Sequence, residues 1–293
     1  GRQECLPHGL FRTFIPIAIL SPMNRIDQIF SDLRSRDAKA LMPFVTAGDG
    51  GLDTTARVLT AMQAGGASIC EVGIPFSDPV ADGPVIQASM TRALDAGTKV
   101  EQVFETVAAV RPSLSVGLVA MVSYSIVYRM GLDRFITDAK AAGFDGFIFP
   151  DLPLDEADDA RAAIKEQGLI LSMLVAPTTP IDRAKEIAAA SSGFVYVVAR
   201  RGVTGEQADL ADDLPGRLSA LRTVTDAPLA VGFGVSTPQH VAQVVQTADA
   251  AIVASALIRR MQDVAEQGGD PVQEAERYTR ELAAGLTGVV GVE

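Results

Sequence analysis

Three carboxylates, Glu71, Asp78 and Asp82, lie in one short stretch that reads EVGIPFSDPVADGP. The run 67–74 is apolar, rich in β-forming residues and bounded by glycine and proline, which predicts a buried strand. A charge inside such a strand is costly unless it is paired, hydrogen-bonded or protonated. Glu71 is therefore either a structural charge satisfied by an arginine or a backbone N–H, or an acid–base group of a catalytic site.

The orientation of Glu71 follows from the two-residue period of a strand, which puts Ile69, Glu71 and Gly73 on one face. The residues between them, including Cys70 and Val72, form the more apolar face, which we expect to pack on helices. Glu71 should then point away from the helices, toward the other side of the sheet.

The elements that would position this carboxylate repeat along the chain from residue 40 to residue 257. Eight strands are predicted, each followed by an amphipathic helix: 40–47, 68–74, 116–122, 146–149, 170–176, 193–199, 228–233 and 250–254. Helices are predicted at 54–64, 84–96, 100–110, 132–142, 154–167, 180–190, 214–224 and 238–246, with two more at 257–267 and 271–286.

Near-continuous apolar strands predict a parallel sheet that is covered on its faces. Eight strand–helix units favour a closed (β/α)8 TIM barrel with extra helices in a single domain, and no glycine-rich dinucleotide-binding turn follows the first strand. The active site of such a barrel lies at the carboxyl ends of its strands. Glu71, Asp49 and Asp151 are all predicted to lie there.

Residue types that are scarce limit the chemistry further. The two histidines are His8, near the start, and His240, in a predicted helix; no His/Cys/carboxylate cluster has metal-ligand spacing. None of the five lysines falls in a predicted strand, and no serine lies in a nucleophile elbow. General acid–base catalysis by carboxylates is the chemistry that remains, with no metal.

Glycines at neighbouring strand ends predict a phosphate site. The sequence VGFGVST ends strand seven, VASAL ends strand eight and RRGVTG follows strand six. The last loops of these barrels often hold phosphate with backbone N–H groups and a helix N-terminus. Glycines that serve only tight turns are the simpler alternative.

Charge, hydropathy and cysteine content limit what the protein can bind and where we expect it. A net charge of −11 argues against binding to nucleic acid, and no apolar run is long enough to span a membrane. Two cysteines give no disulfide framework, so we expect a cytoplasmic protein. Residues 1–22 differ from the rest; we expect an extension or start-site artefact there and the barrel domain at 23–293, with Asn24 capping a first helix.

These motifs resemble the α subunit family of tryptophan synthase from about residue 23 to residue 286. The resemblance rests on PFVTAGD at 43–49, the stretch 71–84, DLP at 151–153, APT at 176–178, 200–205 and GFG at 232–234. It implies retro-aldol cleavage of indole-3-glycerol phosphate to indole and glyceraldehyde 3-phosphate. It also implies that Glu71 and Asp82 are the catalytic pair, with Asp82 holding the indole N–H.

The resemblance also assigns binding residues. It implies an indole pocket lined by Phe44 and Tyr196, and a loop in which Thr204 reaches Asp82 on closure. The substrate-binding set that it implies is Phe44, Tyr196, Thr204, Gly205, Phe233, Gly234, Ala254 and Ser255, with the phosphate on Gly205, Gly234 and Ser255.

The partner implied is a tryptophan synthase β subunit in an α2β2 heterotetramer, which takes up the indole and is contacted by Asp78. Pyridoxal phosphate would belong to that partner, so no cofactor is expected in this chain.

Three departures from the family pattern concern the site walls. Ser123 stands where the family usually has tyrosine, and Ser125-Ile126 where it has Asn-Pro. Ala254 replaces a glycine, which a backbone N–H contact tolerates if φ stays negative, and Arg201 takes a small-residue position.

Other readings remain open at this point. One is a different phosphate-binding TIM-barrel enzyme, although the missing strand lysines count against an indole-glycerol-phosphate synthase. A glycosidase would also use two carboxylates, but it would not need the phosphate-type glycines. The non-enzyme reading is a degenerate barrel that only binds and activates a β-subunit-like partner.

Overall fold

The computed structural model describes residues 23–79, 82–199, 213–232 and 234–287. In this part of the chain nine strands form one parallel sheet, in the order β5-β4-β3-β2-β1-β9-β8-β7-β6. They are β1 (Ala40–Thr46), β2 (Ile69–Gly73), β3 (Gly117–Met121), β4 (Gly146–Ile148), β5 (Ile170–Ser172), β6 (Leu174–Val175), β7 (Val195–Val198), β8 (Leu229–Gly232) and β9 (Ala250–Val253).

The two ends of this sheet belong to one bent strand. Only Met173 separates β5, which pairs with β4, from β6, which pairs with β7. Groups from the next helix–strand connection occupy this point, because the hydroxyls of Ser192 and Ser191 accept from the backbone N–H groups of Leu171 and Met173. Nine short strands thus make the eight strands of the predicted (β/α)8 barrel, which is confirmed.

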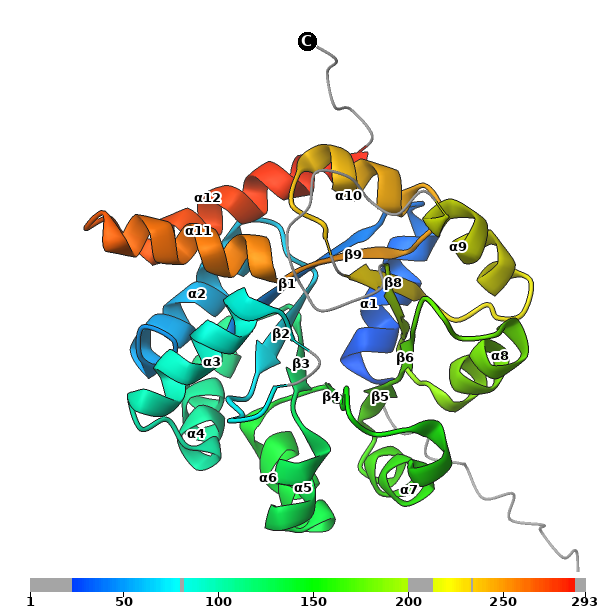
Figure 1. Cartoon of the computed structure of the whole chain (residues 1–293), viewed down its shortest axis with the longest axis horizontal. Coiled ribbons are helices and arrows are strands. Elements are labelled where there is room, and N and C mark those ends of the chain that lie inside the picture. The colour runs from blue at the N-terminus through cyan, green and yellow to red at the C-terminus, as the bar shows by residue number, and fades with distance from the viewer. Residues whose placement is uncertain (1–22, 80–81, 200–212, 233, 288–293) are drawn as a thin grey trace, which may run out of the picture.

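Helices from α2 onward surround the strands on the outside of the barrel, whereas α1 lies within this ring in the view of Figure 1. The helices are α1 (Arg25–Ser35), α2 (Leu52–Ala64), α3 (Pro84–Asp95), α4 (Val100–Val110), α5 (Tyr124–Met130), α6 (Leu132–Ala142), α7 (Asp158–Glu166), α8 (Ile181–Ala190), α9 (Leu214–Arg222), α10 (Pro238–Val245), α11 (Ser255–Glu266) and α12 (Pro271–Ala283). Three short 3₁₀ turns are η1 (Arg111–Ser113), η2 (Leu154–Glu156) and η3 (Ala284–Thr287).

Most outer helices match the sequence expectation to within two residues, and the predicted helix 271–286 ends as α12 at Ala283 and continues as η3. The predicted helix 154–167 divides into η2 and α7, and the helix predicted from 257 begins at Ser255. Helix α5 is not anticipated, because its seven residues include three β-branched or aromatic ones in succession. Its N-terminus is held by a distant group, since the backbone N–H of Tyr124 donates to Asp151 (2.7 Å).

The core has two layers, which follow from the alternation along each strand. Cys70, Val72 and Ile74 belong to the large cluster between strands and helices. Ile69 belongs instead to the cluster inside the barrel, which also includes Tyr196. The period-two assignment of the two faces of β2 is therefore confirmed.

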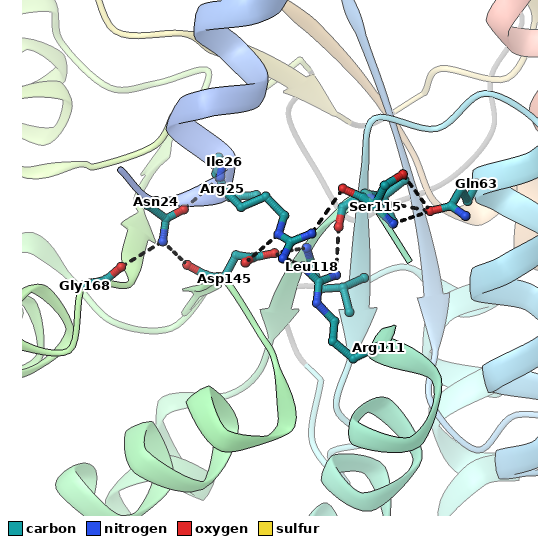
Figure 2. A network of polar contacts seen from close by, with 10 residues as sticks. Asn24, Arg25, Ile26, Gln63, Arg111, Ser115, Leu118, Asp145 and Gly168 are labelled. Carbon is teal, nitrogen blue, oxygen red and sulfur yellow. Dashed lines mark hydrogen bonds and ion pairs between the residues drawn. The ribbon is translucent and has the colours of Figure 1, made fainter. Parts of the chain in front are cut away.

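Helix α1 closes the amino end of the barrel. Asn24 caps it as predicted, accepting from the backbone N–H of Ile26 (2.8 Å), and Ile26 and Phe30 enter the inner cluster. The Asn24 amide also donates to the carbonyls of Asp145 (2.8 Å) and Gly168 (2.9 Å), as Figure 2 shows. Asn24 thus caps α1 and also fixes it to the segments that lead into β4 and β5.

Two aspartates, each directly before a strand, bind the amino ends of neighbouring strands. Asp145, directly before β4, accepts from the backbone N–H of Leu118 in β3 (2.8 Å) and from Arg111 (3.0 Å), as drawn in Figure 2. Asp249, directly before β9, accepts from the backbone N–H of Leu229 in β8 (2.8 Å) and from Arg222. We call these two groups the β3–β4 clasp and the β8–β9 clasp.

Candidate active site

Glu71 lies in β2 on the inner face of the barrel and is fully buried. Its neighbours in register are Phe44 of β1 and Val119 of β3. Within the described residues, neither carboxyl oxygen of Glu71 has a hydrogen-bond partner. Burial raises the pKa of Glu71 to about 8. The side chain therefore carries a proton at neutral pH, and the part of the chain that the structure describes offers it no structural partner that would explain its burial.

Asp82 lies in the loop that leads from β2 into α3 and is half-buried. Its backbone is fixed on both sides: its N–H donates to the carbonyl of Pro79 (3.0 Å), and its carbonyl accepts from the amide of Gln87 (2.7 Å). Burial raises the pKa of Asp82 to about 6. This carboxyl is ionised at neutral pH, in contrast to that of Glu71.

Tyr196 of β7 connects the two carboxyls electrostatically. Burial raises its pKa well above the ordinary value, and Glu71 and Asp82, both ionised at the high pH where a phenol titrates, raise it further. A phenol responds to these charges only if they are close to it in a medium of low polarity. The structure thus brings together three of the predicted site residues from β2, its loop and β7.

Gly73 and Gly232 make room for the rings of Phe44 and Tyr196. The sequence motifs did not assign this role to either glycine. A Cβ atom on Gly73 would lie 2.3 Å from Cζ of Phe44, and one on Gly232 would lie 2.4 Å from the hydroxyl oxygen of Tyr196. Each ring therefore occupies the space over a glycine on the neighbouring strand. The signal in the sequence is a glycine at the end of an apolar strand, which marks a close approach by another group.

A small apolar cluster continues the wall beyond Phe44, which packs with Ile86, Met90 and Ile258. Met121 and Ala254 pack against this cluster from β3 and from the start of α11. The wall thus extends from the predicted indole side to the predicted phosphate side.

A pocket of about 190 Å³ opens next to this cluster at the carboxyl ends of β2 and β3. Its lining includes Asp78, Asp82, Ser123 and Ser125, together with Met121. Glu71 is not part of that lining, so the pocket reaches Asp82 from the loop side.

Ser123 and Asp151 define the far wall of the pocket. The Ser123 hydroxyl donates to the Asp151 carboxylate (2.6 Å), which also accepts from the backbone N–H of Tyr124. Asp151 therefore acts as a cap for α5 here. Ser123, at the position where the resemblance leads us to expect tyrosine, takes part in this cap and lines the pocket.

The predicted phosphate side is described in part. Helix α11 begins at Ser255, so its first N–H groups have no partners within the helix and face the carboxyl end of β9. Ala254 has a φ of −118°, which satisfies the condition for an alanine at this position. Gly234 has a φ of +95°, which favours glycine. Thr204, Gly205, Phe233 and Arg201 lie outside the described residues.

Asp49 and Asp78 differ from the catalytic candidates. Asp49 is engaged by a two-pronged ion pair with Arg92, with both N–O distances at 2.7 Å, so its role is structural. Asp78 is exposed on the rim of the pocket. Across the described residues there is no group of three or more metal-binding side chains, and no helix has the length and apolar character to cross a membrane.

The fold and the site together define a class: a (β/α)8 barrel with two carboxyls of unlike protonation, an aromatic wall and a helix N-terminus at the carboxyl ends of its strands. The family profile described as Tryptophan synthase alpha chain matches residues 30–287. The chain belongs to this family.

Curated relatives and solved structures agree with this assignment. The tryptophan synthase alpha chain of Rhodopirellula baltica is 45% identical over 260 residues, which cover 86% of this chain and 94% of the relative. That of Chloroflexus aggregans is 44% identical over 263 residues, covering 89% and 98%. A structure of Mycobacterium tuberculosis tryptophan synthase has a TM-score of 0.83 at 34% identity, covering 90% of this chain and 98% of that one. The subunit alpha structure from Legionella pneumophila gives 0.82 at 33%, covering 91% and 100%.

Proposed function

We propose that this chain is the α subunit of a tryptophan synthase and cleaves indole-3-glycerol phosphate to indole and glyceraldehyde 3-phosphate. The observation that carries the proposal is Glu71, a buried carboxyl without a hydrogen-bond partner among the described residues and with its pKa raised to about 8. A protonated carboxyl in an apolar barrel is suited to giving a proton to carbon and then taking one from a hydroxyl.

The proposed reaction uses Glu71 twice. Glu71 first protonates C3 of the indole ring, which places positive charge on the ring nitrogen. It then removes the proton from the glycerol hydroxyl nearest the ring. The carbon that bears this hydroxyl becomes the aldehyde carbon. The bond between the ring and the glycerol chain breaks, and its electron pair restores the double bond of indole. Glu71 ends the cycle protonated, as it began.

Asp82 stabilises the charged ring in this scheme. As an ionised carboxyl with a pKa of about 6, it accepts a hydrogen bond from the indole N–H as positive charge develops there. Phe44 and Tyr196 enclose the ring, and the N-terminus of α11 at Ser255 faces the phosphate together with Gly234. Thr204, Gly205, Phe233 and Ala254 complete the proposed substrate-binding set. No cofactor of this chain takes part.

A β subunit that carries pyridoxal phosphate is the proposed partner, in an α2β2 assembly. Asp78 is exposed beside the pocket, and Tyr128 of α5, at the same end of the barrel, has 80% of its surface exposed. An exposed carboxylate and a large exposed aromatic residue suit a protein interface. A solved structure similar to this chain is titled as tryptophan synthase from M. tuberculosis in an aminoacrylate-bound form, which supports a multi-subunit context.

Indole release tests the proposed function directly. The purified chain, with and without a tryptophan synthase β subunit, should release indole from indole-3-glycerol phosphate. Glu71→Gln should lower kcat by at least about a thousandfold, because the chemical step loses its acid and its base. Binding of an analogue that lacks the hydroxyl nearest the ring should change by less than about threefold.

The matched control is Asp95→Asn, an exposed acidic residue at the end of α3, which should keep wild-type turnover. Release of indole by neither preparation of the wild type would overturn the enzyme proposal and favour a barrel that only binds a partner. Wild-type turnover in Glu71→Gln would remove Glu71 from the mechanism.

A further inference from the structure

Tyr278, in the C-terminal helix α12, touches the loop that carries Gly234. The side chain is almost fully buried, with 1% of its surface exposed. Its hydroxyl donates a hydrogen bond to the backbone carbonyl of Ser236 (2.5 Å), in the loop between β8 and α10. A residue far from the strand ends in sequence therefore holds the backbone two positions beyond Gly234.

The ring of the same tyrosine contacts the helix that begins at Ser255. The guanidinium carbon of Arg260, in α11, lies 4.1 Å from the centroid of the Tyr278 ring, a cation–π contact. Arg260 is held over the ring by Glu274 and Glu281 of α12, at 3.6 and 3.4 Å. One side chain thus contacts both described elements of the proposed phosphate side.

The other contacts of the loop between β8 and α10 hold different parts of it from the Ser236 carbonyl that Tyr278 binds. Beyond it, Thr237 caps α10 by accepting from the backbone N–H of His240 (3.1 Å). The Ser236 N–H reaches His240 Nδ1 only at a long distance of 3.4 Å. After α12, Gly285 packs so closely on α10 that a Cβ there would lie 2.2 Å from the Pro238 carbonyl. Helix α12 contacts this loop at Ser236, and η3 contacts the start of α10 at Pro238.

We propose that Tyr278 is a positioning residue for phosphate, which fixes the Gly234–Ser236 loop relative to the N-terminus of α11. The inference rests on the proposed function, because that function places phosphate between these two elements. A phosphate held by N–H groups from two elements binds well only if their separation is fixed before binding. Tyr278 supplies this by a hydrogen bond to one element and a ring contact to the other.

Tyr278→Phe tests the proposal, because it keeps the ring, its packing and the Arg260 contact and removes only the hydroxyl. We expect the dissociation constant for sn-glycerol 3-phosphate, measured by calorimetry, to rise about three- to tenfold, the range for one neutral hydrogen bond. The affinity for indole alone should stay within twofold. With indole-3-glycerol phosphate, KM should rise by the same factor as the dissociation constant while kcat changes by less than twofold.

The matched control is Thr279→Val, the next residue on the same helix. Its buried hydroxyl has no hydrogen-bond partner within the described residues, so its removal should leave both affinities, KM and kcat unchanged. An equal loss of glycerol phosphate affinity in Thr279→Val would show a general effect of helix α12 and overturn the proposal. Equal affinities of the wild type and Tyr278→Phe would also overturn it.

The two proposals can fail separately. A wild type that does not cleave indole-3-glycerol phosphate, but binds glycerol phosphate in a Tyr278-dependent way, would overturn the function and support the positioning role. A wild type that cleaves the substrate, with the same glycerol phosphate affinity in Tyr278→Phe, would support the function and overturn the positioning role. A wild type that neither cleaves the substrate nor binds glycerol phosphate would overturn both.

Discussion

At the scale of single residues, the two carboxyls of the site differ in protonation because they differ in burial. The pKa of Glu71 is about 8 and that of Asp82 is about 6. The proposed reaction needs Glu71 protonated and Asp82 ionised, and both conditions hold only between these values. We predict a bell-shaped dependence of kcat/KM on pH with its maximum near pH 7, falling about tenfold per pH unit beyond either limb.

Steady-state rates of indole release between pH 5 and 10 measure this profile. The acidic limb belongs to Asp82, so the residual activity of Asp82→Asn should lose that limb and keep the alkaline one. A wild-type rate that stayed level from pH 8 to pH 10 would contradict the assignment of Glu71 as the initial acid.

Stability supplies a control for the Glu71→Gln variant. The unfolded chain releases this proton near pH 4.5, whereas the folded chain retains it up to about pH 8. The free energy of unfolding therefore falls as pH rises between these values. Glutamine removes this penalty, so the variant should match the wild type near pH 4.5 and exceed it by roughly 3–5 kcal/mol at pH 9. Its inactivity then cannot result from unfolding.

Much of the residue-level site is accessible from sequence, because the signals are local. Glu71 interrupts an apolar strand, and its face follows from alternation alone. Asp49 shows the limit: its place after a strand resembles that of a catalytic acid, yet Arg92 pairs with it from α3. Tyr278 shows the same limit, since its position in an amphipathic helix does not reveal that its hydroxyl reaches Ser236. Contacts between distant segments decide both roles.

At the scale of elements, glycines on β2 and β8 set the fit between neighbouring strands. We predict that Gly232→Ala forces Tyr196 to move, because the new methyl would lie 2.4 Å from its hydroxyl oxygen and the tyrosine is enclosed. Overpacking of this kind costs about 1–3 kcal/mol of stability. Turnover should fall as well, since the displaced ring lies beside Glu71. Urea denaturation and indole release measure the two effects.

Gly216 provides the comparison for this prediction. It lies within α9, and a Cβ there would meet nothing within 4 Å. Gly216→Ala should therefore leave turnover unchanged and raise stability by up to about 1 kcal/mol. If Gly232→Ala behaved in the same way, the ring of Tyr196 would not be confined as the structure indicates.

Element boundaries are predictable where local patterns set them and not where distant groups do. Helix α12 begins at a proline directly after its capping aspartate, Asp270, and the sequence predicts this first residue correctly, although it places the end at residue 286 and the helix ends at Ala283. The gap between β5 and β6 depends on hydroxyls of Ser191 and Ser192, which come from the next helix–strand connection. Helix α5 depends on Asp151 from the β4 side. No window of sequence around these elements contains the groups that decide them.

At the scale of the whole molecule, the two clasps lie in opposite halves of one closed sheet. In the β3–β4 clasp, burial raises the pKa of Asp145 although Arg111 lies beside it, so desolvation outweighs the attraction. The ion pair itself thus adds little net stability, and the larger cost arises when one partner is removed and the other stays buried alone. Arg111, with 12% of its side chain exposed, would be left in that state.

We predict that Asp145→Ala and Asp249→Ala each lower the free energy of unfolding by about 2–4 kcal/mol, since each leaves an arginine without its carboxylate partner and a strand N–H without an acceptor. The clasps share no residue, so the double variant should lose the sum of the two within about 0.5 kcal/mol. This sum has meaning only if the barrel unfolds as one unit, as expected when β1 pairs with both β2 and β9. Urea unfolding followed by far-ultraviolet circular dichroism should therefore show a single transition in all four proteins. Two transitions, of which Asp249→Ala shifted only one, would show instead that each half of the barrel is stabilised by its own clasp.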